Sequence, residues 1–249
     1  MRYYAVKIKD LWPIGSKEQD ILQEKAYCGL SLSNPNFYGK RLNALIDFLT
    51  EHFDQTLLIT TGYVYRLHYR LFIENDDKAL EYALSKEKHY INEELLPSLE
   101  RLKKLDRNRL KFINWQDISL NSKFEAVFSQ VLRFYTNEID FKDDIEMVAK
   151  NFVEHKLKKV DSPLCCSEAE AIKLSTDFLL EETAVFEYLV NEGYKVDVYP
   201  GIALPALRNI AKFSNAPIGL KHRKALELDI LKRGKNREKI ANKAETATN

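Results

Sequence analysis

The chain has 249 residues, of which 45% are hydrophobic and 30% are charged. This is the composition of a soluble globular protein, and the length suits one large domain or two small ones. The 38 basic and 37 acidic residues nearly cancel, so net charge indicates neither a nucleic acid nor a membrane as partner. The chain contains three cysteines without framework spacing and no apolar run of ~18 residues. We therefore expect a cytoplasmic enzyme without membrane association. In the absence of heptads we expect a monomer.

Hydrophobic periodicity predicts strands that alternate with helices. The predicted strands are residues 3–9, 25–30, 56–61, 110–115 and 195–199. The predicted helices are residues 38–53, 76–106 with a break or kink at Pro97, 122–137, 142–158, 167–191 and 205–213. The helix from Ser167 has the clearest limits, because a capping box begins it and Gly193 follows its end.

This alternation predicts an α/β fold with a Rossmann-like, mostly parallel sheet flanked by helices. We expect one catalytic domain over residues 1–234 and a charged, flexible tail over residues 235–249. Ligands of such sheets bind at the carboxyl ends of the strands. Polar clusters follow three predicted strands, at residues 31–36, 60–63 and 199–201. Their common position predicts a site at this edge of the sheet.

Several cofactor motifs are missing from the sequence. It contains no glycine-rich dinucleotide or P-loop motif, no H-E-x-x-H and no C-x-x-C, so we expect neither a nucleotide cofactor nor a metal. The segment Gly29-Leu-Ser31-Leu-Ser33 lacks the last glycine of a hydrolase elbow. A serine esterase that pairs Ser31 with His222 nevertheless stays open as an alternative.

Three segments carry candidate chemistry. Ser31 follows a predicted strand and precedes a helix, where backbone N–H groups can stabilise an oxyanion. A serine at such a position can also simply form hydrogen bonds within a turn. Glu182 lies at the shoulder of the apolar stripe of the helix from Ser167, with Glu181 further off on the other side. A carboxylate held against a core needs a cation or donors. Tyr199 ends a strand and points either into the crevice or into packing.

Taken together, these segments resemble the tRNA-dependent cyclodipeptide synthases. The resemblance rests on G-x-S-x-x-N-x-x-F at residues 29–37, on Glu182 and on Tyr199, and it extends from about Tyr3 to Phe213. It implies a fold similar to the catalytic domain of tyrosyl- and tryptophanyl-tRNA synthetases. It also implies an aminoacyltransferase that takes amino acids from two aminoacyl-tRNAs through aminoacyl- and dipeptidyl-enzyme forms. The product would be a cyclic dipeptide, made without ATP or metal.

The resemblance also implies roles for single residues. Ser31 would be the nucleophile, Asn34 would orient the intermediate, Glu182 would bind the α-amino group, and Tyr199 would assist positioning and proton transfer. Proline after this tyrosine, here Pro200, is typical of one branch of the family, whereas Asn34 is more typical of others. The expected substrate-binding residues are Tyr27, Gly29, Thr60, Phe178 and Pro200.

One position departs from the family pattern. The family usually has a tyrosine four residues before the glutamate, and this chain has Phe178. The ring is kept and the hydroxyl is lost. Either Glu182 suffices, or a group such as Ser33 or Tyr63 supplies the missing donor, or the register differs.

A tRNA substrate requires cations for its phosphates. One basic cluster could bind these phosphates, but it is an equally good candidate for a solvated charged face. It comprises Arg101, Lys103, Lys104, Arg107, Arg109 and Lys111. A second basic run, from Lys221 to Lys239, is better explained as a charged tail. We expect aminoacyl-tRNA and no DNA as partner. A non-catalytic RNA-binding module on the same sheet is a further alternative.

Overall fold

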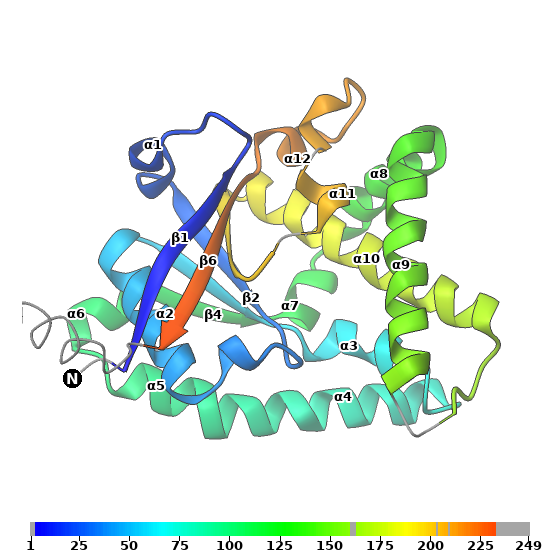
Figure 1. The fold of residues 1–249 in the computed structure, drawn as a ribbon, viewed down its shortest axis with the longest axis horizontal. Helices are drawn as coiled ribbons and strands as arrows, with labels where there is room; N and C mark the ends of the chain where they lie inside the picture. Colours follow the sequence, from blue (N-terminus) through cyan, green and yellow to red (C-terminus); the bar gives the residue numbers. More distant parts are fainter. Residues whose placement is uncertain (1–2, 160–162, 203, 209, 233–249) are drawn as a thin grey trace, which may run out of the picture.

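The computed structural model describes residues 3–159, 163–202, 204–208 and 210–232. Its centre is a six-stranded sheet of order β1-β6-β5-β2-β3-β4 (Figure 1). The strands are β1 (Tyr4–Trp12), β2 (Lys25–Leu30), β3 (Thr56–Thr60), β4 (Leu110–Asn114), β5 (Tyr194–Pro200) and β6 (Lys224–Lys232). Every neighbouring pair is parallel except β1 and β6. The expected mostly parallel α/β sheet is thus confirmed.

Helices cover both faces of this sheet (Figure 1). The helices are α1 (Glu18–Leu22), α2 (Gly39–His52), α3 (Gly62–Tyr69), α4 (Asp76–Tyr90), α5 (Leu96–Glu100), α6 (Lys104–Arg107), α7 (Trp115–Ser119), α8 (Phe124–Asn137), α9 (Ile139–Lys159), α10 (Glu168–Asn191), α11 (Pro205–Arg208) and α12 (Ile218–His222). Short 3-10 turns span Pro35–Phe37 and Ile210–Lys212. In the described part of the chain, no helix combines the length and the apolar character that a membrane crossing requires.

The alternation of side chains along the strands divides the core between the two faces. On β2, Cys28 and Leu30 pack into the cluster that includes α2, whereas Tyr27 packs into the cluster that includes α10. All five residues of β3 are buried, as expected for an apolar strand covered on both sides. The predicted helix start at Ser167 is confirmed, because the Ser167 side chain accepts the N–H of Glu170 at 3.2 Å.

The break or kink expected at Pro97 matches an interruption of the α-helical pattern. A π-helical turn at Ile91–Leu95 separates α4 from α5, and Pro97 lies in the first turn of α5, where proline is tolerated. Several predicted elements differ from the observed ones. Strand β6 was not predicted, since its charged residues resemble a tail. Helices α3 and α7 were also not predicted. The proposed tail, residues 235–249, lies outside the described residues.

Candidate active site

The carboxyl ends of β2, β3 and β5 meet at one edge of the sheet, and the predicted polar clusters lie there. Ser31 follows β2 and Thr61 follows β3. Tyr199 is the residue before the last one of β5. Parallel pairing of β2 with both β3 and β5 brings these ends together. The sequence-based prediction of a site at this edge agrees with this arrangement.

A cavity of about 270 Å³ opens at this edge. Five of the residues predicted from the sequence line it, namely Gly29, Ser31, Phe178, Glu182 and Tyr199. The rest of the wall is mostly apolar and aromatic. It comes largely from β3, α3, α7, α9, α10 and α11, and it also includes Asp197 of β5 and Arg223. The hydroxyl of Ser31 and the carboxylate of Glu182 therefore share one cavity.

Tyr65 holds the hydroxyl of Ser31. Its Oη lies 2.6 Å from Ser31 Oγ and 2.8 Å from Ser33 Oγ, and the two serine oxygens are 3.3 Å apart. Burial raises the pKa of Tyr65, while its hydrogen bonds with the two serines act in the opposite direction. This phenol stays protonated at neutral pH and can donate to either serine. Sequence analysis missed Tyr65, although the i, i+4 pair with Tyr69 is a helical signal.

Helix α3 is fixed by a close contact with α4. A Cβ on Gly62 would lie 2.4 Å from Cβ of Glu87, so this position requires glycine. The buried carboxylate of Glu87 accepts the N–H of Gly62 at 2.9 Å, which satisfies a free donor at the start of α3. The same contact sets the position of Tyr65, one turn further along the helix.

Asn34 ties the Ser31 loop to the end of β5. Its Nδ2 donates to the carbonyl of Pro200 at 3.1 Å and to Oη of Tyr199 at 3.3 Å. Its Oδ1 accepts the N–H of Asn36 at 2.9 Å and so caps the 3-10 turn. Burial raises the pKa of Tyr199 to about 12, so its hydroxyl stays protonated. Asn34 and Pro200 thus support the cavity from outside its lining.

Glu182 is the carboxylate that α10 presents to the cavity. Burial raises its pKa to about 7, the nearby charge of Asp197 acts in the same direction, and Arg223 opposes both. The group therefore changes its charge near neutral pH. A positively charged group of the substrate would stabilise the ionised form of this carboxylate and so lower its pKa again.

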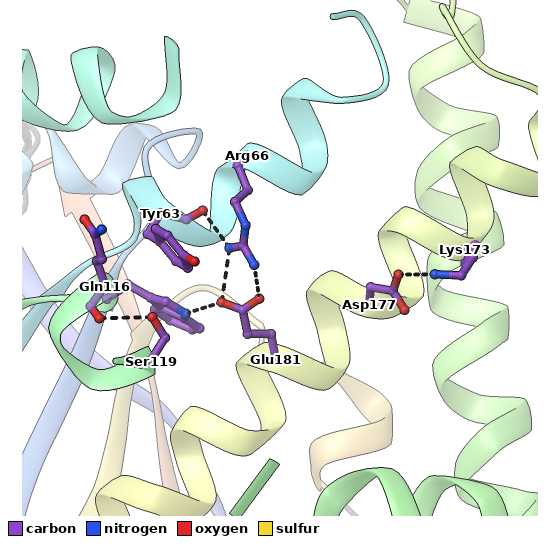
Figure 2. A network of polar contacts seen from close by, with 8 residues as sticks. Tyr63, Arg66, Gln116, Ser119, Lys173, Asp177 and Glu181 are labelled. Atoms are coloured by element: carbon purple, nitrogen blue, oxygen red, sulfur yellow. Dashed lines mark hydrogen bonds and ion pairs between the residues drawn. The ribbon is translucent and has the colours of Figure 1, made fainter. Parts of the chain in front are cut away.

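The neighbouring Glu181 points elsewhere and has a structural role. Its carboxylate accepts two hydrogen bonds from Arg66 on α3, at 2.8 and 3.2 Å, and one from Nε1 of Trp115 at 3.0 Å. Figure 2 shows Arg66 between Glu181 and Tyr63, apart from the surface pair Lys173–Asp177. Glu181 is more deeply buried than the sequence predicted, and it joins α10 to α3 and α7.

Phe178 belongs to an aromatic stack in the cavity wall. Its ring lies 3.9 Å from that of His68 at an interplanar angle of 10°, and His68 stacks on Phe152 at 4.4 Å. Burial lowers the pKa of His68 to about 3, so its imidazole is neutral. Tyr63 is not among the residues that line the cavity, and its ring packs 4.0 Å from the Arg66 guanidinium. Tyr65 brings a hydroxyl to the cavity instead.

Three predicted substrate-binding residues, Tyr27, Thr60 and Pro200, lie outside the cavity lining. Thr60 Oγ1 donates to Oδ1 of Asn114 at 2.9 Å, and the next residue, Thr61, lines the cavity in its place. Tyr27 is buried beneath Gly29, where its Oη accepts from Nε of Arg223 at 3.1 Å. Arg223, predicted as part of a basic tail, is one of the buried cavity residues.

The structure does not join Ser31 to a histidine base. His222 is exposed at the end of α12 and is not among the residues that line the cavity. The partners of the Ser31 hydroxyl are Tyr65 and Ser33. The arrangement of a hydrolase triad is therefore not formed.

The predicted tRNA-binding cluster lies before β4, at the edge of the sheet opposite Ser31. Two of its members are engaged with α2 and the residues at its end. The Arg101 guanidinium contacts Asn43 at 2.6 and 2.7 Å and Asp47 at 2.6 Å, and Arg109 donates to the carbonyl of Thr50 at 2.9 Å. Besides Arg101, the exposed members are Lys103, Lys104, Arg107 and Lys111.

Comparison with known proteins identifies the family. The family model described as "Cyclodipeptide synthase" matches residues 10–186, which is more than half of the chain. The chain therefore belongs to the cyclodipeptide synthase family. A search of curated proteins finds no match.

Solved structures share this fold at low sequence identity. A cyclodipeptide synthase from Fluoribacter dumoffii is 16% identical with a TM-score of 0.79, covering 92% of this chain and 100% of that one. A Mycobacterium tuberculosis protein, whose structure relates cyclodipeptide synthetases to type I tRNA synthetases, is 14% identical with a TM-score of 0.67, covering 93% and 94%. The enzyme of Candidatus Glomeribacter gigasporarum bound to Phe-tRNAPhe is 14% identical with a TM-score of 0.61, covering 84% and 88%.

Proposed function

We propose that this cyclodipeptide synthase takes two amino acids from aminoacyl-tRNAs and joins them through an ester on Ser31. The observation that carries the proposal is the shared cavity of Ser31, Glu182 and Tyr199. The tRNA bound to the Candidatus Glomeribacter gigasporarum enzyme supports aminoacyl-tRNA as substrate. Pro200 after Tyr199 supports the family branch with proline at this position.

The first step exchanges one ester for another, so it needs no further activation. Ser31 Oγ bonds to the carbonyl carbon of the aminoacyl-tRNA, the bond from that carbon to the ribose oxygen breaks, and the serine proton leaves with the ribose hydroxyl. Tyr65 and Ser33 fix the direction of the attacking oxygen. Covalent catalysis of this kind splits a difficult reaction into simpler transfers.

Two further transfers complete the product. The amine of the Ser31-bound amino acid attacks the ester of the second aminoacyl-tRNA and releases the second tRNA. The amine of the resulting dipeptide then attacks the Ser31 ester, closes the ring and frees the serine hydroxyl. Holding each amine near its target supplies a large part of the rate.

Glu182 suits both tasks that these transfers require. As a carboxylate it binds the α-ammonium group of the amino acid on Ser31. Because its pKa is raised to about 7, it can also accept the proton that the ammonium must lose before attack. Tyr199, held by Asn34, contributes a protonated hydroxyl on the same wall.

The proposed tRNA contacts are the exposed side chains of the basic cluster before β4, Lys103, Lys104 and Arg107. Their charge suits phosphate contacts at a distance from the aminoacyl end. Arg101 and Arg109 support this segment through their bonds with α2 and Thr50.

Expression of the wild-type chain and of Ser31→Ala in the same host tests the proposal. Mass spectrometry of the culture medium should detect a diketopiperazine with the wild type and none with the variant. The Asp177→Asn variant, altered at a half-exposed residue of α10, is the control and should match the wild type. An equal yield from Ser31→Ala would rule out the serine ester.

A further inference from the structure

An open path leads from the Ser31 hydroxyl into the molecule. Residues 27, 29 and 31 point to the same side of β2, because side chains alternate along a strand. A Cβ on Gly29 would meet no other atom within 4 Å. Glycine at this position therefore leaves open space between Ser31 and the buried ring of Tyr27.

A buried ion pair lies at the level of Tyr27. Asp197 is the register partner of Tyr27 on β5, and its Oδ2 contacts Nη2 of Arg223. The side chains of Asp197 and Arg223 are only 7% and 3% exposed, and both residues line the cavity. Arg223 also donates to Tyr27 Oη and to the carbonyl of Leu207, and its guanidinium lies 4.8 Å from the Phe186 ring.

This pair leaves one acceptor open to the cavity. Among the residues described in the structure, Asp197 accepts a hydrogen bond only at Oδ2. Its Oδ1 is not one of the enclosed polar atoms that lack a partner, so a ligand in the cavity that Asp197 lines can reach it. The cavity wall also holds two carboxylates, Glu182 and Asp197, against the single guanidinium of Arg223. Both features favour a hydrogen-bond donor in this part of the cavity.

An ion pair brings no advantage to a pocket for a hydrocarbon side chain. Taking both charges out of water is costly, and well-packed apolar residues of similar volume are often at least as stable. This part of the cavity wall accepts apolar residues, since Phe186 and Leu207 line it and are buried. The pair is thus better explained by what it offers to a ligand.

We propose that Asp197 determines specificity, and that the amino acid esterified to Ser31 has a side chain ending in an N–H or O–H donor. This inference rests on the proposed function, with Glu182 binding the α-ammonium group and Asp197 the end of the side chain. Four residues of strand, roughly 13 Å, separate Ser31 from the level of the ion pair. A side chain that passes Gly29 toward Asp197 is therefore a long one.

The test compares near-isosteric aminoacyl-tRNAs on the purified wild-type protein. Tyrosyl- and phenylalanyl-tRNA, or glutaminyl- and leucyl-tRNA, are supplied separately, and the mass of the Ser31 adduct and of any cyclic dipeptide is recorded. The donor member of at least one pair should react at least about 100-fold faster, because a site built for a hydrogen bond rejects an analogue that lacks it.

A double variant links this preference to the ion pair. Asp197→Leu with Arg223→Met removes both charges together, so that neither remains buried alone. The preference for the donor member should fall at least about ten-fold. If thermal unfolding shows that the double variant is not folded, Asp197→Asn replaces it, because this change keeps the shape of the side chain. Asp197→Asn should also reduce the preference for the donor member. Asp177→Asn is the matched control and should leave the preference unchanged.

The outcomes separate this inference from the function on which it rests. A preference for the hydrocarbon member of every pair, or an unchanged preference in the double variant, overturns the role of Asp197 alone. Absence of any adduct and of any cyclic dipeptide with all aminoacyl-tRNAs overturns the proposed function, and the role of Asp197 with it.

Discussion

The hydroxyl of Tyr65 on α3 lies 2.6 Å from Oγ of Ser31 at the end of β2. No histidine takes part in this contact, and the third member of the group is Ser33. Tyr65 is held in turn by packing against Phe178, with the two rings 5.7 Å apart at an angle of 90°. The direction of the nucleophile is therefore set by α3.

Removing this hydroxyl should slow the first transfer. In Tyr65→Phe, Ser31 keeps a contact only with Ser33, so we expect kcat for adduct formation to fall about three- to ten-fold, the equivalent of one hydrogen bond. The KM for aminoacyl-tRNA should change little, because the lost hydroxyl contacts Ser31 and Ser33 and the ring that lines the cavity is kept. Single-turnover kinetics with the Ser31 adduct as readout measures both.

The control for this variant is Tyr69→Phe. Tyr69 lies one turn further along α3, and its hydroxyl forms no hydrogen bond with the residues that the structure describes. Its loss should leave kcat unchanged. Equal effects of the two substitutions would show that Tyr65 acts through the stability of α3 and not through Ser31.

The raised pKa of Glu182 predicts a pH dependence. Below about pH 7 the side chain is mostly protonated and offers no counter-charge to an ammonium group, and above it the carboxylate predominates. The kcat/KM of the wild type, divided by that of Glu182→Gln, should therefore rise with pH through about 7. Ionisation of the substrate affects both proteins equally, so its effect on kcat/KM cancels in this ratio.

The size of this ratio is also predicted. Glu182→Gln should lower kcat/KM by about 100-fold or more at pH 8, the usual contribution of a general acid–base group. A ratio that is constant between about pH 6 and about pH 8 would mean that the charge of Glu182 is not used.

Glu181 and Glu182 should differ in what their loss affects. Glu181→Gln leaves Arg66 without its counter-charge, and the ion-paired side chains are only 9% and 24% exposed. We expect a loss of about 1–3 kcal/mol in the free energy of unfolding, measured in urea. Glu182→Gln removes an unfavourable buried charge and should not destabilise the protein.

The exposed pair in Figure 2 is the control for this experiment. Lys173 and Asp177 contact each other at 2.6 Å, but their side chains are 73% and 39% exposed. Asp177→Asn should cost at most about 0.5 kcal/mol, because solvent screens such pairs. A similar loss in both variants would contradict the structural role assigned to Glu181.

The basic cluster predicts the salt dependence of tRNA binding. Replacing Lys103, Lys104 and Arg107 by alanine should weaken binding and flatten the log–log plot of affinity against salt, by about 0.7–0.9 per lost phosphate contact. Arg101→Ala should lower stability and keep the slope, since its guanidinium is bound by Asn43 and Asp47. An unchanged slope in the triple variant would place the tRNA on another surface.

The sequence predicted those parts of the site that depend on local signals. Ser31 follows an apolar strand, Tyr199 ends another, and the capping box at Ser167 sets the register of α10 and so directs Glu182 to the cavity. Each of these positions can be inferred from a few neighbouring residues, because strand ends and helix phases have short-range causes.

The remaining parts depend on contacts between distant segments. Asp197 and Arg223 are 26 residues apart and meet because β6 pairs with β5, a strand that its charged sequence concealed. Tyr65 reaches Ser31 because Gly62 lets α3 approach Glu87 on α4. The periodicity of a single segment does not show which distant segments contact each other. The Asp197–Arg223 ion pair and the contact of Tyr65 with Ser31 are therefore seen only in the folded structure.

The most direct test of the account is the mass of the intact protein after mixing with a pool of aminoacyl-tRNAs. We predict an increase by one aminoacyl residue, located at Ser31 by fragmentation and absent from Ser31→Ala. An adduct at another residue, or cyclic dipeptide formation without any adduct, would contradict the role of Ser31.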